Sequence, residues 1–204
     1  MKYAAFLAAC SAALVVASPI AQLASVEDEV AVEPTDYPTT ALFHHNIHRT
    51  NHSVDPLAWN DTLAGFAQTL VDTCEYQLNT SIGGGGYGQN VAMKVSSGSL
   101  EPADLAVARA ITNMWYNPGV QRFPTDAYGT NPPMENFNDW GSFTQVIWRA
   151  TRDVGCATAF CPSGSLAEGM PGWLTVCNYY PPGNVIGRFA NNVNAPLGQD
   201  SVSP

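Results

Sequence analysis

Four cysteines that follow an apolar N-terminal segment constrain the fold of this chain more than any other feature. Residues 1–18 carry a lysine at the second position, continue as an apolar run and end in two small residues, which is the layout of a secretory signal peptide. Export places a chain in an oxidising compartment, where an even number of cysteines can pair completely. The cysteines beyond the signal are Cys74, Cys156, Cys161 and Cys177. We therefore expect a secreted domain with two disulfides, whose pairing the spacing does not decide.

Two other interpretations of these features are weaker. A membrane anchor needs about 20 apolar residues, whereas Ser11 and Pro19 interrupt the N-terminal run. A zinc site is disfavoured because Cys156 and Cys161 lack the Cys-x-x-Cys spacing and no histidine follows Cys74. We expect neither a stable membrane anchor nor a structural metal.

The acidic composition restricts the partners of the chain. It has 8 Lys and Arg against 17 Asp and Glu, which gives a formal net charge of -9. Nucleic acids and anionic membranes attract proteins mainly through Lys and Arg, so neither is an expected partner. Secretion also gives meaning to three Asn-x-Ser/Thr sequons, which make Asn51, Asn60 and Asn79 candidate glycosylation sites.

Hydrophobic spacing predicts three helices in the first part of the chain. The acidic residues 19–38, interrupted by prolines, are expected to form a disordered leader. Helical spacing then covers residues 39–51, the stretch from the capping residues Asn60 and Asp61 to the glycines at 83–86, and the stretch from Glu101 to Pro118-Gly119, where we expect the third helix to end.

The second part of the chain has the pattern of a long loop followed by strands. Residues 117–141 are rich in Pro, Gly, Asn and aromatic residues, which is typical of a binding loop. Alternating apolar residues predict strands over 143–148, 154–160 and 173–179, and the patternless residues 193–204 are expected to be a disordered tail. Helices followed by late strands indicate an α+β fold, with helices packed over a small, mainly antiparallel sheet.

Six motifs have the order and spacing of a known family. They are His45-Asn46-x-x-Arg49 with Pro56-Leu57-x-Trp59-Asn60, Gly86-Tyr87-Gly88-Gln89-Asn90, Trp115-Tyr116-Asn117, the segment Gly141 to Trp148, Val154-Gly155-Cys156, and the segment Val176 to Asn184. Together they resemble the CAP superfamily of cysteine-rich secretory, antigen 5 and plant PR-1 proteins, most closely its fungal secreted members. The resemblance covers residues 39–192 and implies a three-layer α-β-α sandwich, the SCP domain, with disulfides Cys74–Cys161 and Cys156–Cys177.

The chain departs from the family at the cleft that gives many members their metal. Such members place two histidines and two acidic residues around this cleft. The matching positions here are Leu78, Gln89, Pro118 and Ser142. None of these side chains titrates near neutral pH, and Leu and Pro offer no ligand atom. The resemblance therefore implies a degenerate cleft with no metal, no cofactor and no catalytic residue.

The four histidines lie together at the first predicted helix instead. His44 and His48, or His48 and His52, are four residues apart and share a helical face, which makes them a candidate metal site. No acidic residue or cysteine lies nearby in sequence, so we favour the interpretation that His45 packs in the core and the others are solvated. Ser142 is a weak candidate nucleophile, because neither a base nor a Gly-x-Ser-x-Gly elbow accompanies it.

Aromatic residues in the long loop suggest a ligand. The fungal relatives that the resemblance indicates are associated with binding and exporting sterols or fatty acids through an aromatic loop, which corresponds here to residues 121–140. Four rings there can offer flat apolar area to a lipid, namely Phe123, Tyr128, Phe137 and Trp140. The alternative is that some of them pack the loop against its own domain.

These features favour a binding protein over an enzyme. We expect a secreted, PR-1-like protein that binds or exports sterols or other small lipids, including fatty-acid-like ligands. The alternative is a ligand-free extracellular effector or wall-associated protein whose partner is a host or cell-wall component. A hydrolase of unusual design that uses Ser142 is the third hypothesis.

Overall fold

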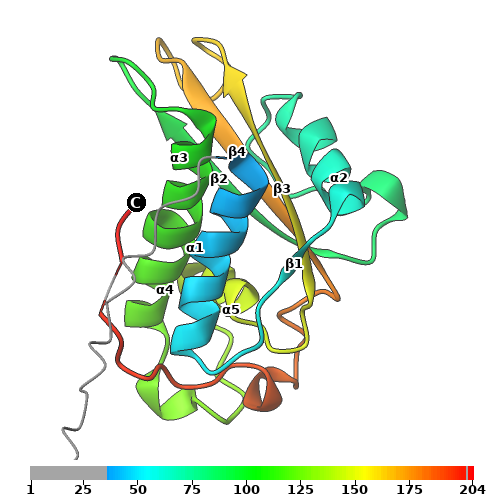
Figure 1. The fold of residues 1–204 in the computed structure, drawn as a ribbon, viewed down its shortest axis with the longest axis vertical. Helices are drawn as coiled ribbons and strands as arrows, with labels where there is room; N and C mark the ends of the chain where they lie inside the picture. The colour runs from blue at the N-terminus through cyan, green and yellow to red at the C-terminus, as the bar shows by residue number, and fades with distance from the viewer. Residues whose placement is uncertain (1–35, 201) are drawn as a thin grey trace, which may run out of the picture. The chain divides into compact units, whose positions relative to one another are not determined.

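Three layers of secondary structure form the part of the chain that the computed structural model describes, residues 36–200 and 202–204. The helices are α1 (Tyr37–Asn51), α2 (Asp61–Val71), α3 (Ala103–Arg109), a π-helix (Ala110–Tyr116), α4 (Asn117–Arg122) and α5 (Phe137–Val146), and the strands are β1 (Ala58–Trp59), β2 (Gly88–Val95), β3 (Asp153–Cys161) and β4 (Gly172–Tyr180). Helix α2 covers one face of the sheet, and α1 and α3 cover the other (Figure 1). The expected signal peptide and nearly all of the expected leader lie outside the described residues.

The four strands form one mixed sheet in the order β1-β3-β4-β2. Strand β1 pairs in parallel with β3, and the other two pairings are antiparallel. Side chains of β4 alternate between the layers: Leu174 and Val176 pack in the cluster under α2, while Cys177 and Tyr179 belong to the larger cluster under α1. The structure thus confirms the predicted α+β sandwich with a mainly antiparallel sheet.

Helix α1 is fixed at both ends by side-chain hydrogen bonds. It begins inside the segment assigned to the leader, because Asp36 caps it by accepting from the Thr39 amide at 3.1 Å. Near its other end, the fully buried Arg49 guanidinium donates to the carbonyl oxygens of Asp55, Val146, Trp148 and Thr151 at 2.7 to 3.1 Å. Arg49 therefore ties α1 to the C-terminal end of α5.

The strand expected over residues 143–148 is wrong, because most of this segment belongs to α5. Trp140, Phe143 and Ile147 are all buried, and their spacing of three and four residues is that of one helical face. Val146 and Trp148 flank Ile147, so this short segment with its closely spaced apolar residues looked like a strand. The predicted strands over 154–160 and 173–179 are confirmed as β3 and β4.

The third helix does not end at Pro118-Gly119. It continues from α3 through the π-helix into α4, which carries Pro118 in its first turn, where a missing amide hydrogen is tolerated. A Cβ atom on Gly119 would lie 2.3 Å from the Phe143 Cβ, so this glycine allows α4 to approach α5. Much of the expected loop at 117–141 is therefore helical.

Strand β2 was not predicted, and its polar start explains why. It begins with Gly88, Gln89 and Asn90, which have low strand propensity, and it pairs with β4 over its whole length from Gly88 opposite Tyr179 to Val95 opposite Gly172. The sheet partner rather than local preference makes this segment a strand.

Both disulfides that the resemblance implied are present. Cys74–Cys161 joins the segment after α2 to the end of β3 across 87 residues of sequence, and Cys156–Cys177 joins directly paired positions of β3 and β4. The first closes the longer loop and so restricts the unfolded chain more strongly.

The tail that we expected to be disordered contacts helix α1 over residues 193–199. Val193 is buried, and the Asn194 side-chain nitrogen donates to the His52 carbonyl oxygen at 2.9 Å. The Leu197 amide donates to the Asn51 carbonyl oxygen at 2.6 Å. Backbone partners therefore hold a segment whose sequence has no hydrophobic pattern.

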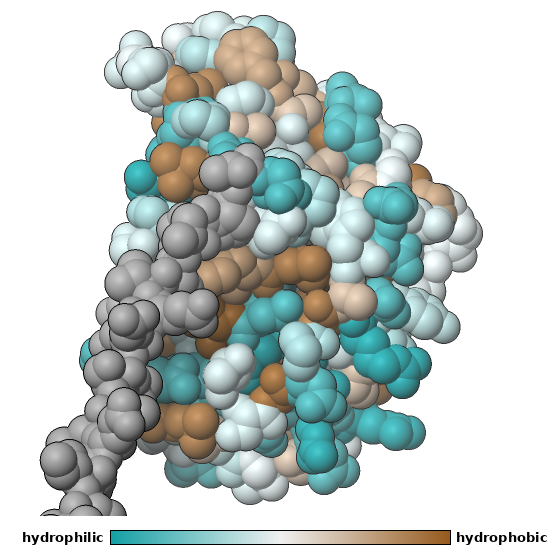
Figure 2. All heavy atoms as spheres, in the orientation of Figure 1, coloured by the Kyte–Doolittle hydropathy of each residue, from teal (hydrophilic) through white to brown (hydrophobic). Residues whose placement is uncertain are grey.

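The surface gives no sign of a membrane-spanning element within the described residues. None of the helices there is long and apolar enough to cross a bilayer. Figure 2 shows apolar side chains in separate groups between hydrophilic ones on the face that it presents.

We predict that Gly155→Ala lowers the free energy of unfolding by at least about 2 kcal/mol, since overpacking forces the backbone apart. A Cβ atom at Gly155 would lie 2.2 Å from the Ala64 amide nitrogen and 2.4 Å from the Asn60 carbonyl oxygen, so α2 would have to move off β3. Gly65→Ala is the matched control, because its Cβ atom meets nothing within 4 Å, and it should stabilise by up to about 1 kcal/mol. Urea unfolding measures both, and equal stability of Gly155→Ala and the parent would contradict this packing.

Candidate functional site

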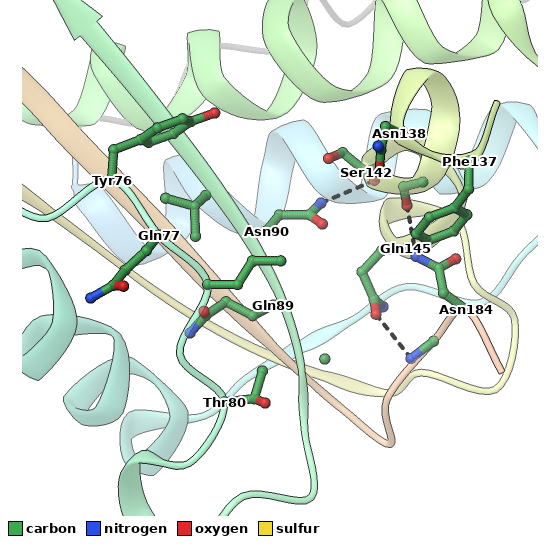
Figure 3. A pocket seen from close by; sticks show the side chains of 15 residues that line it. Tyr76, Gln77, Thr80, Gln89, Asn90, Phe137, Asn138, Ser142, Gln145 and Asn184 are labelled. Carbon is green, nitrogen blue, oxygen red and sulfur yellow. Dashed lines mark hydrogen bonds between the residues drawn. The ribbon is translucent and has the colours of Figure 1, made fainter. Parts of the chain in front are cut away.

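A cleft of about 550 Å³ lies at the end of the sheet where β2 begins and β4 ends. It is lined from residues 76–80, from the start of β2 at 88–91, from α5 at 137–145, and from residues 183–184 after β4. Tyr76 and Phe137 lie on opposite sides, with Asn90 of β2 between them (Figure 3). Segments distant in sequence thus meet in one candidate site.

Three of the four degenerate positions meet at this cleft. Leu78 is 68% exposed at its edge, Gln89 comes from the start of β2, and Ser142 comes from α5. Pro118 lies in α4 and is not among the described residues that line the cleft. Leu78, Gln89 and Ser142 therefore lie at one cleft, as the alignment with the family implies, whereas Pro118 does not.

The donor atoms at this cleft do not fit a divalent metal. Among the described residues that line it, none is acidic, basic or a histidine. The Gln89 side-chain oxygen already accepts from the Asn79 amide at 2.7 Å, and its nitrogen donates to the Asn178 side-chain oxygen at 2.8 Å. Leu78 offers no ligand and Ser142 only a neutral hydroxyl, so the chain supplies neither the charge nor the ligand count of a zinc site.

Gln145 connects the walls of the cleft. Its side-chain oxygen accepts from the Gly183 amide at 2.9 Å (Figure 3). A Cβ atom at Gly88 or at Gly183 would lie under 3 Å from the Gln145 amide group, so both positions need glycine for this close approach. Asn184 adds a second link, because its nitrogen donates to the Gly141 carbonyl oxygen at 2.8 Å.

A chain of neutral hydrogen bonds runs from the cleft into the core. The Asn90 side-chain nitrogen donates to the Ser142 carbonyl oxygen at 3.0 Å (Figure 3) and to the Tyr179 hydroxyl at 3.4 Å. Tyr179 in turn lies 2.9 Å from His45 Nε2, while His45 Nδ1 lies 2.7 Å from the Ala41 carbonyl oxygen. The carbonyl oxygen only accepts, so Nδ1 carries the His45 proton and Tyr179 donates to Nε2. Burial raises the pKa of the Tyr179 phenol above its ordinary value, which keeps it a donor.

The histidines are buried rather than solvated, which corrects the expectation for His44, His48 and His52. His44 Nδ1 and His48 Nε2 lie 2.9 and 2.8 Å from the same Thr112 hydroxyl oxygen. His48 also stacks on the Tyr116 ring with 3.7 Å between ring centroids. The helix turns this face toward α3 and the π-helix, so the side chains find neutral partners in the core.

The histidines do not form the alternative metal site either. His44 and His48 direct their bonded nitrogens at Thr112, and His52 Nδ1 lies 2.6 Å from the Asn194 carbonyl oxygen. Within the described part of the chain, the one grouping of three potential metal ligands is His45 with Cys156 and Cys177. The two sulfurs of that group are bonded to each other, so it has no thiolate to offer.

The four aromatic candidates of the loop are separated by the fold. Phe123 and Trp140 are 2% and 1% exposed and belong to the core, with 5.2 Å between their ring centroids. Tyr128 is half-buried against Phe123, and only Phe137 lines the cleft. Phe123 and Trp140 therefore pack this segment against its own domain, as the alternative interpretation held, and are not available to a ligand.

The three sequons differ in what their side chains already do. The Asn51 nitrogen donates to the Tyr116 hydroxyl at 2.9 Å, and its oxygen accepts from the Gln199 amide. The oxygens of Asn60 and Asn79 accept local backbone bonds, from Leu63 and from Ser81. A glycan replaces an amide hydrogen of the nitrogen, so Asn60 and Asn79 accommodate one more easily than Asn51.

Gln145, Asn90 and Asn184 are structural residues of the cleft that the sequence alone did not single out. All three lie inside the matched motifs. The recurrence of amides beside glycines, as in Gly88-Gln89-Asn90 and Gly183-Asn184, was the available signal, because close backbone approach needs both.

We predict that acid destabilises the fold through the buried histidines. Desolvation lowers the pKa of both His45 and His48 to about 3, below the value of an unfolded histidine, so the unfolded chain binds protons first as pH falls. The free energy of unfolding is then at its full value above about pH 6.5, and it falls by about 2 to 3 kcal/mol per histidine when the pH reaches about 4.5. Urea unfolding at both pH values checks this, and His48→Gln should reduce the loss. An identical loss in parent and variant would count against it.

Comparisons with known proteins agree with this geometry. The model of the cysteine-rich secretory protein family, CAP, matches residues 42–179. A probable pathogenesis-related protein of Arthroderma benhamiae is 43% identical over 169 residues, which are 82% of this chain and 52% of that protein. Protein PRY2 of Saccharomyces cerevisiae is 34% identical, over 78% of this chain and 41% of its own length. The chain thus spans about half or less of these two fungal relatives.

A plant relative and two solved structures extend the similarity. Pathogenesis-related protein 1C of Nicotiana tabacum is 35% identical over 71% of this chain and 74% of its own length. Na-ASP-1 matches with a TM-score of 0.61 and 21% identity, over 82% of this chain and 43% of that chain. NaASP2, solved with Zn2+, matches with a TM-score of 0.58 and 18% identity, over 82% and 91%. At such identities the structures show the fold alone. The chain belongs to the cysteine-rich secretory protein (CAP) family, as a PR-1-like protein of the fungal type.

Proposed function

We propose that this protein is secreted and binds a sterol or a similar small neutral lipid in the cleft, without catalysing a reaction. The observation that carries the proposal is the chemistry of the cleft, whose described lining residues are all uncharged. The signal-peptide layout and the two disulfides support an extracellular location.

The cleft has the size and polarity for an amphipathic ligand. Its volume of about 550 Å³ falls within the range of about 300 to 1,000 Å³ that small-molecule sites occupy. Leu78 and Phe137 supply apolar walls, and Asn138 and Ser142 supply neutral groups that can exchange hydrogen bonds with a hydroxyl. A sterol combines a flat apolar body with one hydroxyl, which matches this division.

The same chemistry selects against a fatty acid and against hydrolysis. A carboxylate that leaves water needs a cationic partner, and no described residue lining the cleft is Lys, Arg or His. A serine nucleophile needs a base beside its hydroxyl, and no described residue lining the cleft is His, Asp, Glu or Lys. Binding of a neutral molecule is the activity that remains.

Saturable binding of radiolabelled ergosterol to the purified protein tests the proposal. Phe137→Ala should weaken binding about ten-fold or more, because losing the burial of an aromatic ring against the ligand costs about 1.5 kcal/mol or more. Phe160→Ala is the matched control: Phe160 is an exposed aromatic residue outside the cleft, and its loss should leave the affinity unchanged. Thermal unfolding of each variant confirms that it is folded. No saturable binding to the parent protein would overturn the proposal.

A further inference from the structure

Large apolar side chains are exposed on the two loops that flank the cleft. We call these the mouth loops: residues 76–80, before β2, and residues 180–187, which begin with the last residue of β4. Leu78 is 68% exposed on the first, and Ile186 is 80% exposed on the second, together with the exposed Tyr76, Tyr180 and Val185. Five of the eight exposed large apolar residues in the described part of the chain lie on these loops. Such clustering marks an interaction surface.

Hydrogen bonds hold the two mouth loops at the same end of the sheet. Gln89 binds the Asn79 backbone amide through its oxygen and the Asn178 side chain through its nitrogen, so it joins the first loop to β4. The second loop starts at the last residue of β4 and is fixed by the bond from the Gly183 amide to Gln145. Both loops also line the cleft, so its opening lies between exposed apolar residues.

The charge of this surface indicates the kind of partner. Residues 76–80 and 180–187 contain no Asp, Glu, Lys or Arg, in a chain with a net charge of -9. The acidic remainder is repelled by anionic lipid, whereas the mouth loops can enter a neutral bilayer surface without desolvating a charge of their own; the charged residues that flank them, Glu75 and Arg188, are opposite in sign. Tyr76 and Tyr180 suit the boundary between headgroups and chains, because each combines an apolar ring with a polar tip.

We propose that the mouth loops seat the cleft on the surface of an uncharged, zwitterionic bilayer, with Leu78 and Ile186 entering the lipid. The inference rests on the proposed function, since a membrane is where a sterol is found. A small number of inserted side chains gives weak, reversible attachment, and the ligand then passes between bilayer and cleft without crossing water.

Sedimentation with sterol-free phosphatidylcholine vesicles tests this docking. The parent protein should partition onto the vesicles, and Ile186→Ser should reduce the partition coefficient at least five-fold. Adding phosphatidylserine to the vesicles should lower the partition coefficient of the parent protein, because its net charge is negative. Leu197→Ser is the matched control, because Leu197 is 63% exposed but lies in the C-terminal tail, and it should behave like the parent. Ile186 does not line the cleft, so ergosterol delivered from cyclodextrin should bind Ile186→Ser and parent equally.

The outcomes separate docking from ligand binding. A parent protein that binds ergosterol from cyclodextrin but does not sediment with vesicles would overturn the docking and leave the proposed function intact. Vesicle binding without any ergosterol binding would overturn the proposed function instead. Equal sedimentation of Ile186→Ser and the parent, or stronger binding to phosphatidylserine vesicles, would show that the mouth loops are not the contact surface.

Discussion

Hydrogen bonds of side-chain amides hold the cleft in shape. Gln145 joins α5 to the loop after β4, Gln89 joins residues 76–80 to β4, and Asn90 joins β2 to α5. An amide both donates and accepts, so each of these side chains bridges two backbone segments without carrying charge. Burying a neutral group that keeps a hydrogen-bond partner costs far less free energy than burying an ion. Most polar atoms of these amides therefore already make hydrogen bonds within the protein. A cleft built in this way, without charge, suits a neutral ligand.

The side chains that form hydrogen bonds in the core beneath the cleft are also mostly uncharged. Asn90, Tyr179 and His45 form an uncharged chain of hydrogen bonds, and the other histidines of α1 also have neutral partners. The buried cation Arg49 is stabilised by four backbone carbonyls. Burial still lowers its pKa to about 10, and this value leaves it charged at neutral pH. We therefore expect acid to act on the buried histidines of the core, while the described residues that line the cleft hold no group that titrates near neutral pH.

The sequence predicted the elements whose pattern is local and failed where a distant partner decides. Strands β3 and β4 and the start of α2 follow from apolar alternation and from the capping residue Asn60. Strand β2 depends on β4 rather than on its own residues, and α5 was mistaken for a strand because Val146, Ile147 and Trp148 form a short apolar run at its end. The disulfide pairing came from the family resemblance, since spacing left three choices open.

The candidate site was predictable only in part, for a related reason. The family alignment located Leu78, Gln89 and Ser142 at one cleft, but it could not show that Phe123 and Trp140 point into the core. Nor could the alignment show that the histidines near the end of α1 are buried, because the sequence of one helix does not show which of its faces the other elements cover. Burial is a property of the assembled layers, and it decided which aromatic and polar residues remain available to a ligand.

We infer that the family scaffold persists here around a cleft whose side chains can neither coordinate a metal nor exchange protons near neutral pH. Isothermal titration calorimetry of the purified protein with Zn2+ near neutral pH is the decisive measurement. We expect no stoichiometric binding of Zn2+ that depends on cleft residues. Tight one-to-one binding of Zn2+ that is lost when Gln89 and Ser142 are both replaced by alanine would contradict it.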